Sequence, residues 1–211
     1  MHITEGVLSA PVLALGAATT VTGLWLGLRR LEEDRLVMAA ALAAAFFIGS
    51  LIHVPLGPSS VHLLLNGLAG LLLGWVAFPV IFVGLLLQAL LFQFGGLLVL
   101  GVNTTAVALP AVLCGLVLRP LLLARGGRSA LVAGMLAGSG AVLGTALLVA
   151  LALALTDQGF LTAAKLVVLA HLPVAAIEGV MAAFVVGFLG QTRPDLLICA
   201  LPAATEGGSP C

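Results

Sequence analysis

Long apolar runs alternate with short polar or turn-forming breaks along almost the whole chain. Most runs have the length of about 20 residues that a helix needs to cross the hydrocarbon core of a bilayer. The breaks contain charged residues, glycines and prolines, which are typical of loops and helix ends. The predicted spans cover residues 7–28, 36–52, 61–78, 80–99, 106–123, 129–155 and 166–189. The pattern therefore predicts an all-α, polytopic membrane protein with seven transmembrane helices.

Composition supports the same class. Hydrophobic residues make up 62% of the 211-residue chain and charged residues only 8%, and the mean hydropathy is +1.30. Soluble domains carry roughly 25% charged residues. We therefore expect one transmembrane domain over residues 1–190, followed by a cytoplasmic tail at 191–211. The formal net charge of zero gives no electrostatic case for binding nucleic acid, and three cysteines without a C-x-x-C spacing indicate no thiolate metal site.

Basic residues are distributed unevenly between the two ends of the predicted spans. Seven of the eight Lys and Arg residues fall on one side and only Lys165 falls on the other. Because cytoplasmic loops carry an excess of basic residues, the sequence predicts that the N-terminus lies outside and the C-terminus in the cytoplasm. Glu5 precedes the first apolar run and Arg29 and Arg30 follow it, which favours a retained span over a cleaved signal peptide.

The first two residues, Met1 and His2, offer a set of metal-binding nitrogens. The terminal amine, the peptide nitrogen of His2 and the His2 imidazole can close two small chelate rings on one ion, in nearly one plane. One further imidazole would complete a square of four nitrogens. Such tetragonal nitrogen geometry suits Ni²⁺ or Cu²⁺, and imidazole also suits Co²⁺. A histidine at position 2 usually has no such role, so the hypothesis depends on the rest of the chain.

Three of the four histidines, His2, His53 and His62, are predicted to share the outer face. His62 is the favoured fourth ligand, because a helix that begins there presents its imidazole at the outer mouth. His53 precedes a Val-Pro pair that forces an extended backbone, which suits a loop anchor or a hydrogen-bond donor to a ligand as readily as a ligand itself. Asn103, in the polar break at 101–105, either orients a ligand or holds a loop closed, or is simply a turn residue.

Four stretches carry a family resemblance. They are Met1-His2-Ile3-x-Glu5-Gly6; residues 60–68 with Gly70 and Gly74; Gly101-Val102-Asn103-Thr104 with Pro110-Ala111; and His171-Leu172-Pro173 with Glu178-Gly179. In this order, over roughly residues 1–190, they resemble the CbiM/NikM family, the substrate-binding (S) membrane subunits of energy-coupling-factor (ECF) transporters for cobalt and nickel. The resemblance implies that Co²⁺ or Ni²⁺ is bound at the outer face of a bacterial cytoplasmic (inner) membrane by the Met1 amine, the His2 amide and imidazole, and His62. It does not separate cobalt from nickel.

The resemblance also implies an N-terminal helix plus a six-helix core, and a set of partners. The chain has no Walker sequence G-x-x-x-x-G-K-[ST], so it does not bind ATP by that motif and is expected to be a transporter subunit without enzyme activity. The implied partners are a transmembrane coupling (T) subunit, two cytoplasmic ATPase subunits and a small auxiliary membrane subunit, together with the lipid bilayer.

Small residues at every fourth position let helices approach closely. Those in the second and sixth predicted spans are Ala39, Ala40, Ala43 and Ala44, and Gly134, Gly138, Gly140 and Gly144. The alanines suit partner docking and internal packing equally well. For the glycines of the sixth span, internal packing is the favoured interpretation.

Glu178 lies in an apolar span, where a carboxylate is costly and is by default a functional candidate. It is seven residues after His171, on the same helix face. The pair suits a proton or ion relay, whereas a glutamate bound by backbone groups or by the partner subunit is equally consistent. The relay would make the chain a stand-alone proton-coupled metal permease, an alternative that requires more intramembrane carboxylates and makes no use of His2.

A rhomboid-like intramembrane serine protease is a further alternative, because the segments around His62, Ser139 and His171 are similar to pieces of that pattern. Helix rise argues against it. Counted from the predicted span ends, Ser139 lies about 24 Å below the outer surface and His171 about 8 Å below it, at about 1.5 Å per residue. A nucleophile and its base must lie within about 3 Å of each other.

Overall fold

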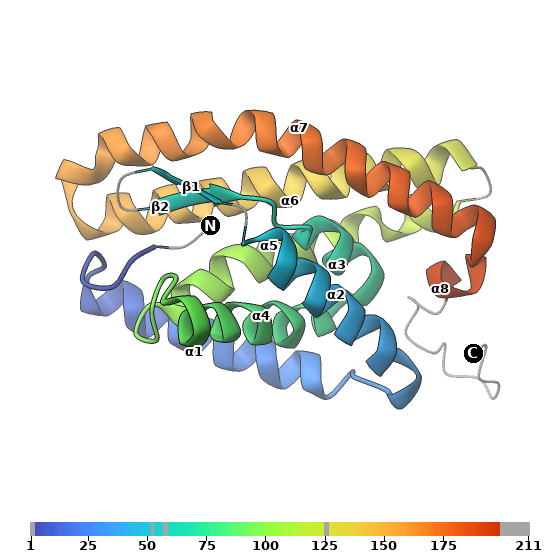
Figure 1. The fold of residues 1–211 in the computed structure, drawn as a ribbon, viewed down its shortest axis with the longest axis horizontal. Helices are drawn as coiled ribbons and strands as arrows, with labels where there is room; N and C mark the ends of the chain where they lie inside the picture. The colour runs from blue at the N-terminus through green and yellow to red at the C-terminus, as the bar shows by residue number, and fades with distance from the viewer. Residues whose placement is uncertain (1–2, 52, 57–58, 125–126, 199–211) are drawn as a thin grey trace.

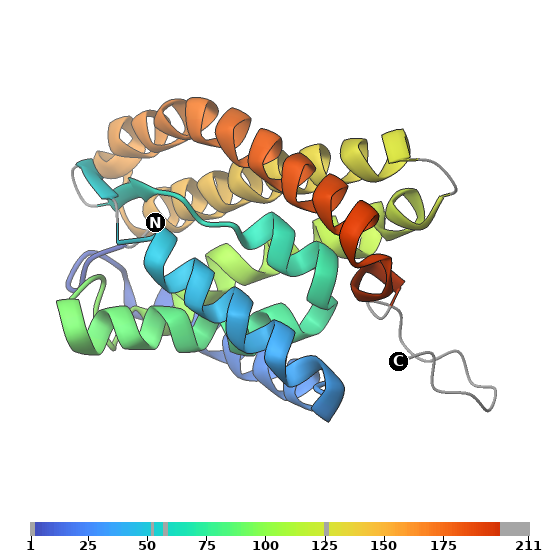
Figure 2. The ribbon, with the colours of Figure 1, turned by 45° about the vertical axis from the view of Figure 1, so that its right-hand side comes forward.

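The computed structural model describes residues 3–51, 53–56, 59–124 and 127–198. The helical elements are α1 (Ala10–Leu28), η1 (Glu33–Arg35), α2 (Leu36–Gly49), α3 (Asn66–Leu73), η2 (Gly74–Val76), α4 (Ala77–Phe92), α5 (Leu100–Leu123), α6 (Gly127–Thr156), η3 (Gln158–Phe160), α7 (Leu161–Thr192) and α8 (Pro194–Ile198), and the strands are β1 (His53–Leu56) and β2 (Ser59–His62). Helices α6 and α7 lie along one side of the molecule, α1, α2 and α4 along the other, and α3 and α5 between them (Figures 1 and 2).

Five segments among the described residues are long and apolar enough to cross a membrane. They are α1, the continuous segment Asn66–Phe92, α5, α6, and the segment Gln158–Thr192 that contains α7. The protein is therefore a multi-pass membrane protein, as the sequence predicts. Helix α2 has 14 residues, and α3 and α4 count as one apolar segment because only a short 3₁₀ turn separates them. The count of seven spans and their orientation stay predictions.

Two predicted helix breaks are in the wrong place. The third and fourth spans were expected to meet at Pro79, yet the helix is interrupted at Gly74, which has φ +59°, a conformation that glycine adopts without steric cost. Pro79 lies in the first turn of α4, where a missing N–H does no harm. The polar stretch 101–105, predicted as a loop, is the beginning of α5.

The polar residues at the beginning of α5 are used in helix packing. Thr105 donates a hydrogen bond to the Gly16 carbonyl of α1 (3.0 Å), and Thr20 of α1 donates to the Gly101 carbonyl (2.6 Å). The chain turns earlier, between α4 and α5, where Gln93, Gly95 and Gly96 have positive φ. Polar residues that predict a loop from the sequence are thus part of a helix, because their hydroxyls form hydrogen bonds to the neighbouring helix.

One element is missing from the predicted pattern, a short antiparallel hairpin formed by β1 and β2. Residues 61 and 62 were expected to open a helix, but they end β2, and α3 begins only at Asn66. Pro55 explains part of the difference, because proline keeps the preceding residue extended. The hairpin packs against α7, and its register pairs His53 with His62.

The glycines of α6 pack against other helices of the same chain, as predicted from the sequence. A Cβ atom on Gly138 would lie 2.5 Å from the Glu178 carbonyl oxygen of α7, and one on Gly144 would lie 2.7 Å from Pro110 of α5. Such distances are well inside van der Waals contact, so these helices approach as closely as their backbones allow. The two contacts place α6 directly against α7 at Gly138 and against α5 at Gly144.

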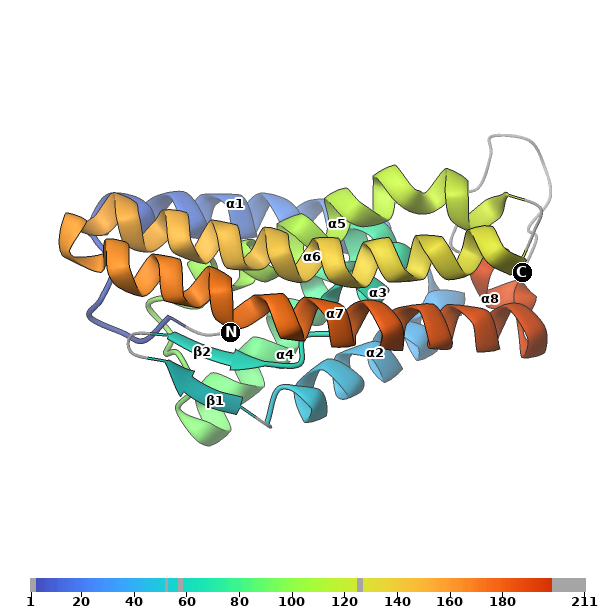
Figure 3. The same ribbon diagram turned by 90° about the horizontal axis from the view of Figure 1, so that it is seen from above.

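Basic residues are divided unevenly between the two ends of the bundle. Helices α1, α5 and α7 end, and α6 begins, at the end away from the hairpin (Figure 3). Arg29, Arg30, Arg119, Arg128 and Arg193 lie at or near these helix ends, whereas Lys165 lies near the beginning of α7, at the hairpin end.

Candidate metal-binding site

The N-terminal segment is fixed to the bundle by the side chain of Asn103. The Ile3 N–H donates to Asn103 Oδ1 (2.9 Å), and Asn103 Nδ2 donates to the Ile3 carbonyl (3.2 Å). Both residues are buried, and Ile3 has no exposed surface. Asn103 is held at the first turn of α5. The amide therefore anchors the residue that directly follows His2.

Glu5 makes the second attachment of the N-terminal segment. Its N–H donates to the Gly95 carbonyl (3.1 Å), and its carboxylate accepts a hydrogen bond from the Leu98 N–H (2.9 Å). Gly96 has φ +128°, and a Cβ atom there would collide with the Glu5 side chain. The turn between α4 and α5 is thus shaped to receive Glu5, and the segment is attached both at Ile3 and at Glu5.

His62 is buried at the end of β2, with 3% of its surface exposed. Its Nδ1 lies 2.9 Å from the Leu63 carbonyl oxygen, a distance at which Nδ1–H donates. In that tautomer Nε2 carries the lone pair, which is the arrangement that metal-binding histidines commonly adopt. Burial lowers the pKa of His62 to about 4, so the imidazole is neutral at physiological pH, as a metal ligand must be.

The segment that follows His62 is held by Glu178 of α7. Its carboxylate accepts hydrogen bonds from the N–H groups of Leu64 and Leu65, the latter at 2.8 and 2.9 Å from its two oxygens. Leu65 has φ +49°, a strained conformation for a bulky side chain, and it turns two successive N–H groups toward one anion. Of the roles considered for Glu178, the structure shows binding to backbone groups.

Asn66 attaches the same segment to two further helices. Its Nδ2 donates to the Val107 carbonyl of α5 and to the Thr145 hydroxyl of α6, both at 3.0 Å. Ile3 and Leu64 belong to one buried hydrophobic cluster. The N-terminal segment and the segment after His62 are thus attached to neighbouring turns of α5, at Asn103 and Val107.

The predicted site residues are placed as follows. Met1 and His2 lie outside the described residues, and His53 is described through its backbone pairing with His62. Asn103 contacts the N-terminal segment. Within the described part of the chain, no group of three or more His, Cys, Asp or Glu side chains is arranged to hold a metal ion.

The serine protease alternative fails on hydrogen bonding. Ser139 donates to the Ala175 carbonyl (2.8 Å), and His171 pairs through Nδ1 with the Val167 carbonyl (2.6 Å). Among the described residues, His171 Nε2 has no partner, so no Ser-His dyad exists there. The predicted difference in depth between Ser139 and His171 is too large, because α7 begins at Leu161, which places His171 deeper. Ala175 is only one turn from His171, about 6 Å along the axis.

The fold and this region define a class, that of helical multi-pass membrane proteins with a buried histidine and an anchored N-terminal segment. Comparison with protein families narrows the class. Residues 2–196 match the family model described as "Cobalt uptake substrate-specific transmembrane region", CbiM. The chain belongs to the CbiM family.

Relatives and solved structures agree with this assignment. A putative metal transport protein of Haemophilus influenzae is 42% identical over 93% of this chain and 97% of its own length. The cobalt transport protein CbiM of Sorangium cellulosum is 34% identical over 93% of this chain and 94% of its own. A crystal structure of a transition metal transporter, 28% identical, superimposes with a TM-score of 0.71 over 92% of this chain and 94% of that one. The chain is thus a membrane component of cobalt or nickel transport.

Proposed function

We propose that this chain captures Co²⁺ or Ni²⁺ at the outer face of the membrane, in a square of four nitrogens. Three come from the N-terminus, namely the Met1 amine and the His2 amide and imidazole, and the fourth is His62 Nε2. The metal is the transported substrate. Tetragonal nitrogen ligation of this kind suits late first-row divalent ions. Under this proposal Asn103 positions the N-terminal ligands, and His53, paired across the hairpin, is a loop anchor.

The observation that carries the proposal is the fixed position of Ile3. A terminal segment of an ordinary membrane protein is poorly ordered unless something ties it down. Here Ile3 is fully buried, and Asn103 satisfies both of its backbone polar groups. Ile3 also shares a hydrophobic cluster with Leu64, two residues after His62. The N-terminal segment is thus attached to α5 at Asn103, one helical turn from Val107, which accepts a hydrogen bond from Asn66 in the segment after His62.

The charge distribution supports the proposed orientation. The described arginines lie at or near the end away from the hairpin, and Lys165 lies at the hairpin end. With the basic end in the cytoplasm, the hairpin and the N-terminus face outward. Residues 1–190 then form one transmembrane metal-binding domain, and residues 191–211 form a cytoplasmic tail.

Energy for transport comes from partners under this proposal. A transmembrane coupling subunit, two cytoplasmic ATPases and a small auxiliary membrane subunit complete an ECF importer. Of the four alanines of α2, Ala39 is buried and Ala43 packs against the core. Ala40 and Ala44 are exposed, so these two are the alanines that suit docking of the coupling subunit by close helix approach.

The decisive experiment compares a native N-terminus with one extended by several residues, measuring Co²⁺ and Ni²⁺ binding to the purified full-length chain by titration calorimetry. We expect the extended protein to lose binding although His2 and His62 remain, because its amine no longer lies beside His2. A single added residue is unsuitable, since it would create a new amine-amide chelate with histidine third in the chain. Unchanged binding by the extended protein, or no binding by either protein, would overturn the proposed site.

A further inference from the structure

Four arginines line a cavity of about 390 Å³ at the end of the bundle away from the hairpin. Its charged and aromatic lining consists of Arg29, Arg30, Glu32, Arg35, Arg119 and Trp75. Against four guanidinium groups stands one carboxylate, that of Glu32, which lies 3.9 Å from Arg35. The cavity therefore carries a positive charge that its own lining does not neutralise.

Arg119 has a buried donor atom that an anion in the cavity could satisfy. It lies in the last turns of α5, half-buried, and Arg35 is near enough to repel it electrostatically. Among the described residues, its Nε is buried without a hydrogen-bond partner. A buried donor that remains unsatisfied destabilises the folded protein, and the cost is larger in a charged group. An anion in the cavity would remove this cost.

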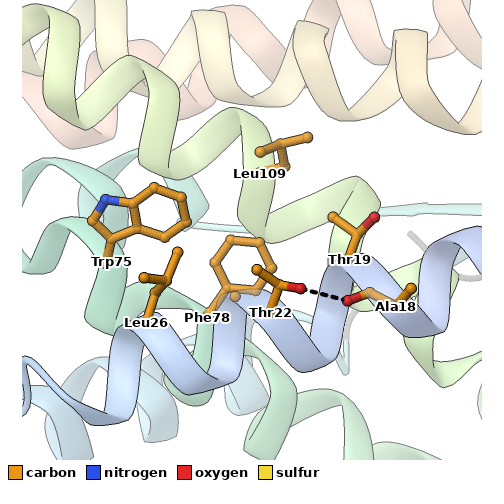
Figure 4. A pocket seen from close by; sticks show the side chains of 8 residues that line it. Ala18, Thr19, Thr22, Leu26, Trp75, Phe78 and Leu109 are labelled. Atoms are coloured by element: carbon orange, nitrogen blue, oxygen red, sulfur yellow. Dashed lines mark hydrogen bonds between the residues drawn. The ribbon is translucent and has the colours of Figure 1, made fainter.

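A second, apolar groove of about 300 Å³ adjoins the cavity. It runs between α1, α4 and α5 and is lined by Ala18, Thr22, Leu26, Phe78 and Leu109 together with Trp75 (Figure 4). Trp75 lines both the groove and the cavity. From Leu26 to Ala18 the groove follows α1 for about 12 Å at about 1.5 Å per residue.

A basic cavity that continues into an apolar groove suits a ligand with an anionic group and an apolar chain. We propose that the cavity binds the phosphate of an anionic glycerophospholipid, with one acyl chain lying in the groove along α1. Arginine is the residue of choice for phosphate, because its planar fork offers two parallel N–H donors. Arg30 lies 5.7 Å from the Trp75 ring centroid, which places a cation at the junction of the cavity and the groove.

The depth of the site agrees with a lipid. Trp25 and Trp75 lie beside it, and Arg29 stacks on Trp25 at 3.9 Å from the ring centroid. Tryptophan and arginine together are typical of the headgroup level of a membrane, and basic pockets between transmembrane helices bind phosphate headgroups. A free phosphate would fill the cavity but would leave the groove empty, so the groove favours the lipid.

The test uses delipidated full-length protein in a neutral detergent, titrated with phosphatidylglycerol and monitored by native mass spectrometry and by thermal unfolding. Phosphatidylcholine is the probe with the same chains and no net charge, and inorganic phosphate is the probe without chains. We expect one phosphatidylglycerol to remain bound and to raise the unfolding temperature. Arg119→Gln and Arg30→Gln should each weaken that binding roughly tenfold or more, the effect of losing one charge-assisted hydrogen bond.

Arg128→Gln is the matched control, because Arg128 is exposed at the same end of the bundle and does not line the cavity. It should bind phosphatidylglycerol as the unaltered protein does. Equal retention of phosphatidylcholine, or equal binding by the Arg119 variant when its thermal unfolding shows it to be folded, would overturn the proposal. Stabilisation by inorganic phosphate as large as that by the lipid would replace it with a free-anion site. None of these outcomes depends on metal binding.

Discussion

The side chain of Asn103 forms two hydrogen bonds with the backbone of Ile3, across one hundred residues of sequence. An asparagine amide has one donor and one acceptor group, and here both face a peptide unit, as a neighbouring β-strand would. Ile3 is thereby fixed although it belongs to no strand or helix. Residues that stabilise this contact should control any chemistry at the N-terminus.

Replacement of Asn103 by alanine is therefore expected to release the N-terminal segment. The Ile3 N–H loses its partner, at a cost of roughly 1–3 kcal/mol, so residues 3–5 should exchange their amide hydrogens faster. Affinity for Co²⁺ or Ni²⁺ should fall roughly tenfold or more, since each 1.4 kcal/mol corresponds to a factor of ten. Hydrogen exchange followed by mass spectrometry and titration calorimetry measure the two effects separately.

Thr104→Val is the control for this experiment. The Thr104 hydroxyl is buried beside Asn103 and has no hydrogen-bond partner among the described residues. Its replacement by a methyl group of similar size should leave exchange at Ile3 and metal affinity unchanged. If Asn103→Ala exchanges no faster than this control, the two hydrogen bonds do not hold the segment.

Glu178 is expected to be needed for the stability of the segment that follows His62. Glu178→Ala leaves the buried N–H of Leu64 and the partly buried N–H of Leu65 without their acceptor, and should lower the free energy of unfolding by roughly 2–4 kcal/mol. Glu178→Gln keeps one carbonyl acceptor and should lie between the alanine variant and the unaltered protein. Thermal unfolding in detergent, with the metal absent, gives this order.

The comparison variant for Glu178 is Glu33→Gln. Glu33 is an exposed carboxylate at the beginning of η1, and surface changes of this kind usually alter stability by about 0.5 kcal/mol or less. A Glu178→Ala protein as stable as Glu33→Gln would show that the carboxylate is dispensable, and would reopen the relay interpretation of Glu178 with His171.

His62 makes the stability of the folded protein depend on pH, and the burial of its imidazole determines the sign of that dependence. Its pKa is about 4 in the folded protein and about 6.5 as the ordinary value. Between these values the unfolded chain binds a proton that the folded chain does not, so stability falls as the pH falls from 6.5 to 4. The full loss is roughly 3.5 kcal/mol at about 1.4 kcal/mol per pH unit.

The measurement is the unfolding temperature of metal-free protein at pH 7.0 and at pH 4.5, compared with that of His62→Gln. All other titrating groups are common to both proteins, so the difference between their pH responses isolates His62. The unaltered protein should lose more stability on acidification than the variant. Parallel curves would mean that His62 is exposed to solvent and titrates normally.

The long helices could be predicted from the sequence because neighbouring residues determine where they begin and end. The runs at 129–155 and 166–189 correspond to α6 and α7 within about five residues at each end, since charged or turn-forming residues bound them. It misplaced the beginning of α5 because Thr105 is satisfied by Gly16 of α1, a contact far away in sequence. The break at Gly74 was assigned to Pro79 instead, because proline is the stronger sequence signal for a helix break. Proline is nevertheless tolerated in the first turn of a helix, where Pro79 lies.

The candidate site was predictable in its residue types and not in its supports. His62 and Asn103 stand out in an apolar chain because they are polar, and Glu178 because a carboxylate there is costly. The contacts of Asn103 and Glu178 are with residues about one hundred positions away, such as Leu65 for Glu178. No periodicity or spacing in the sequence predicts such contacts, because they depend on how α7 packs against the segment after β2.

Close packing between α6 and α7 predicts a graded response to alanine at three glycines of α6. At Gly138 an added Cβ lies 2.5 Å from the Glu178 carbonyl oxygen, so a helix backbone must move. At Gly140 it lies 3.2 Å from the Cys114 sulfur, the end of a flexible side chain, and at Gly127 it meets nothing within 4 Å. Overpacking against rigid neighbours costs about 1–3 kcal/mol, whereas alanine in open helical surroundings is favoured over glycine.

Gly138→Ala should therefore lower the unfolding temperature most and Gly140→Ala less, while Gly127→Ala should leave it unchanged or raise it. Because Gly138 contacts the backbone of Glu178 itself, its variant should also loosen the Leu64–Leu65 segment, which faster amide exchange at those residues would detect. The Gly127 variant controls for the general effect of alanine in a helix. Equal unfolding temperatures for all three would mean that α6 and α7 are farther apart than the fold described here requires.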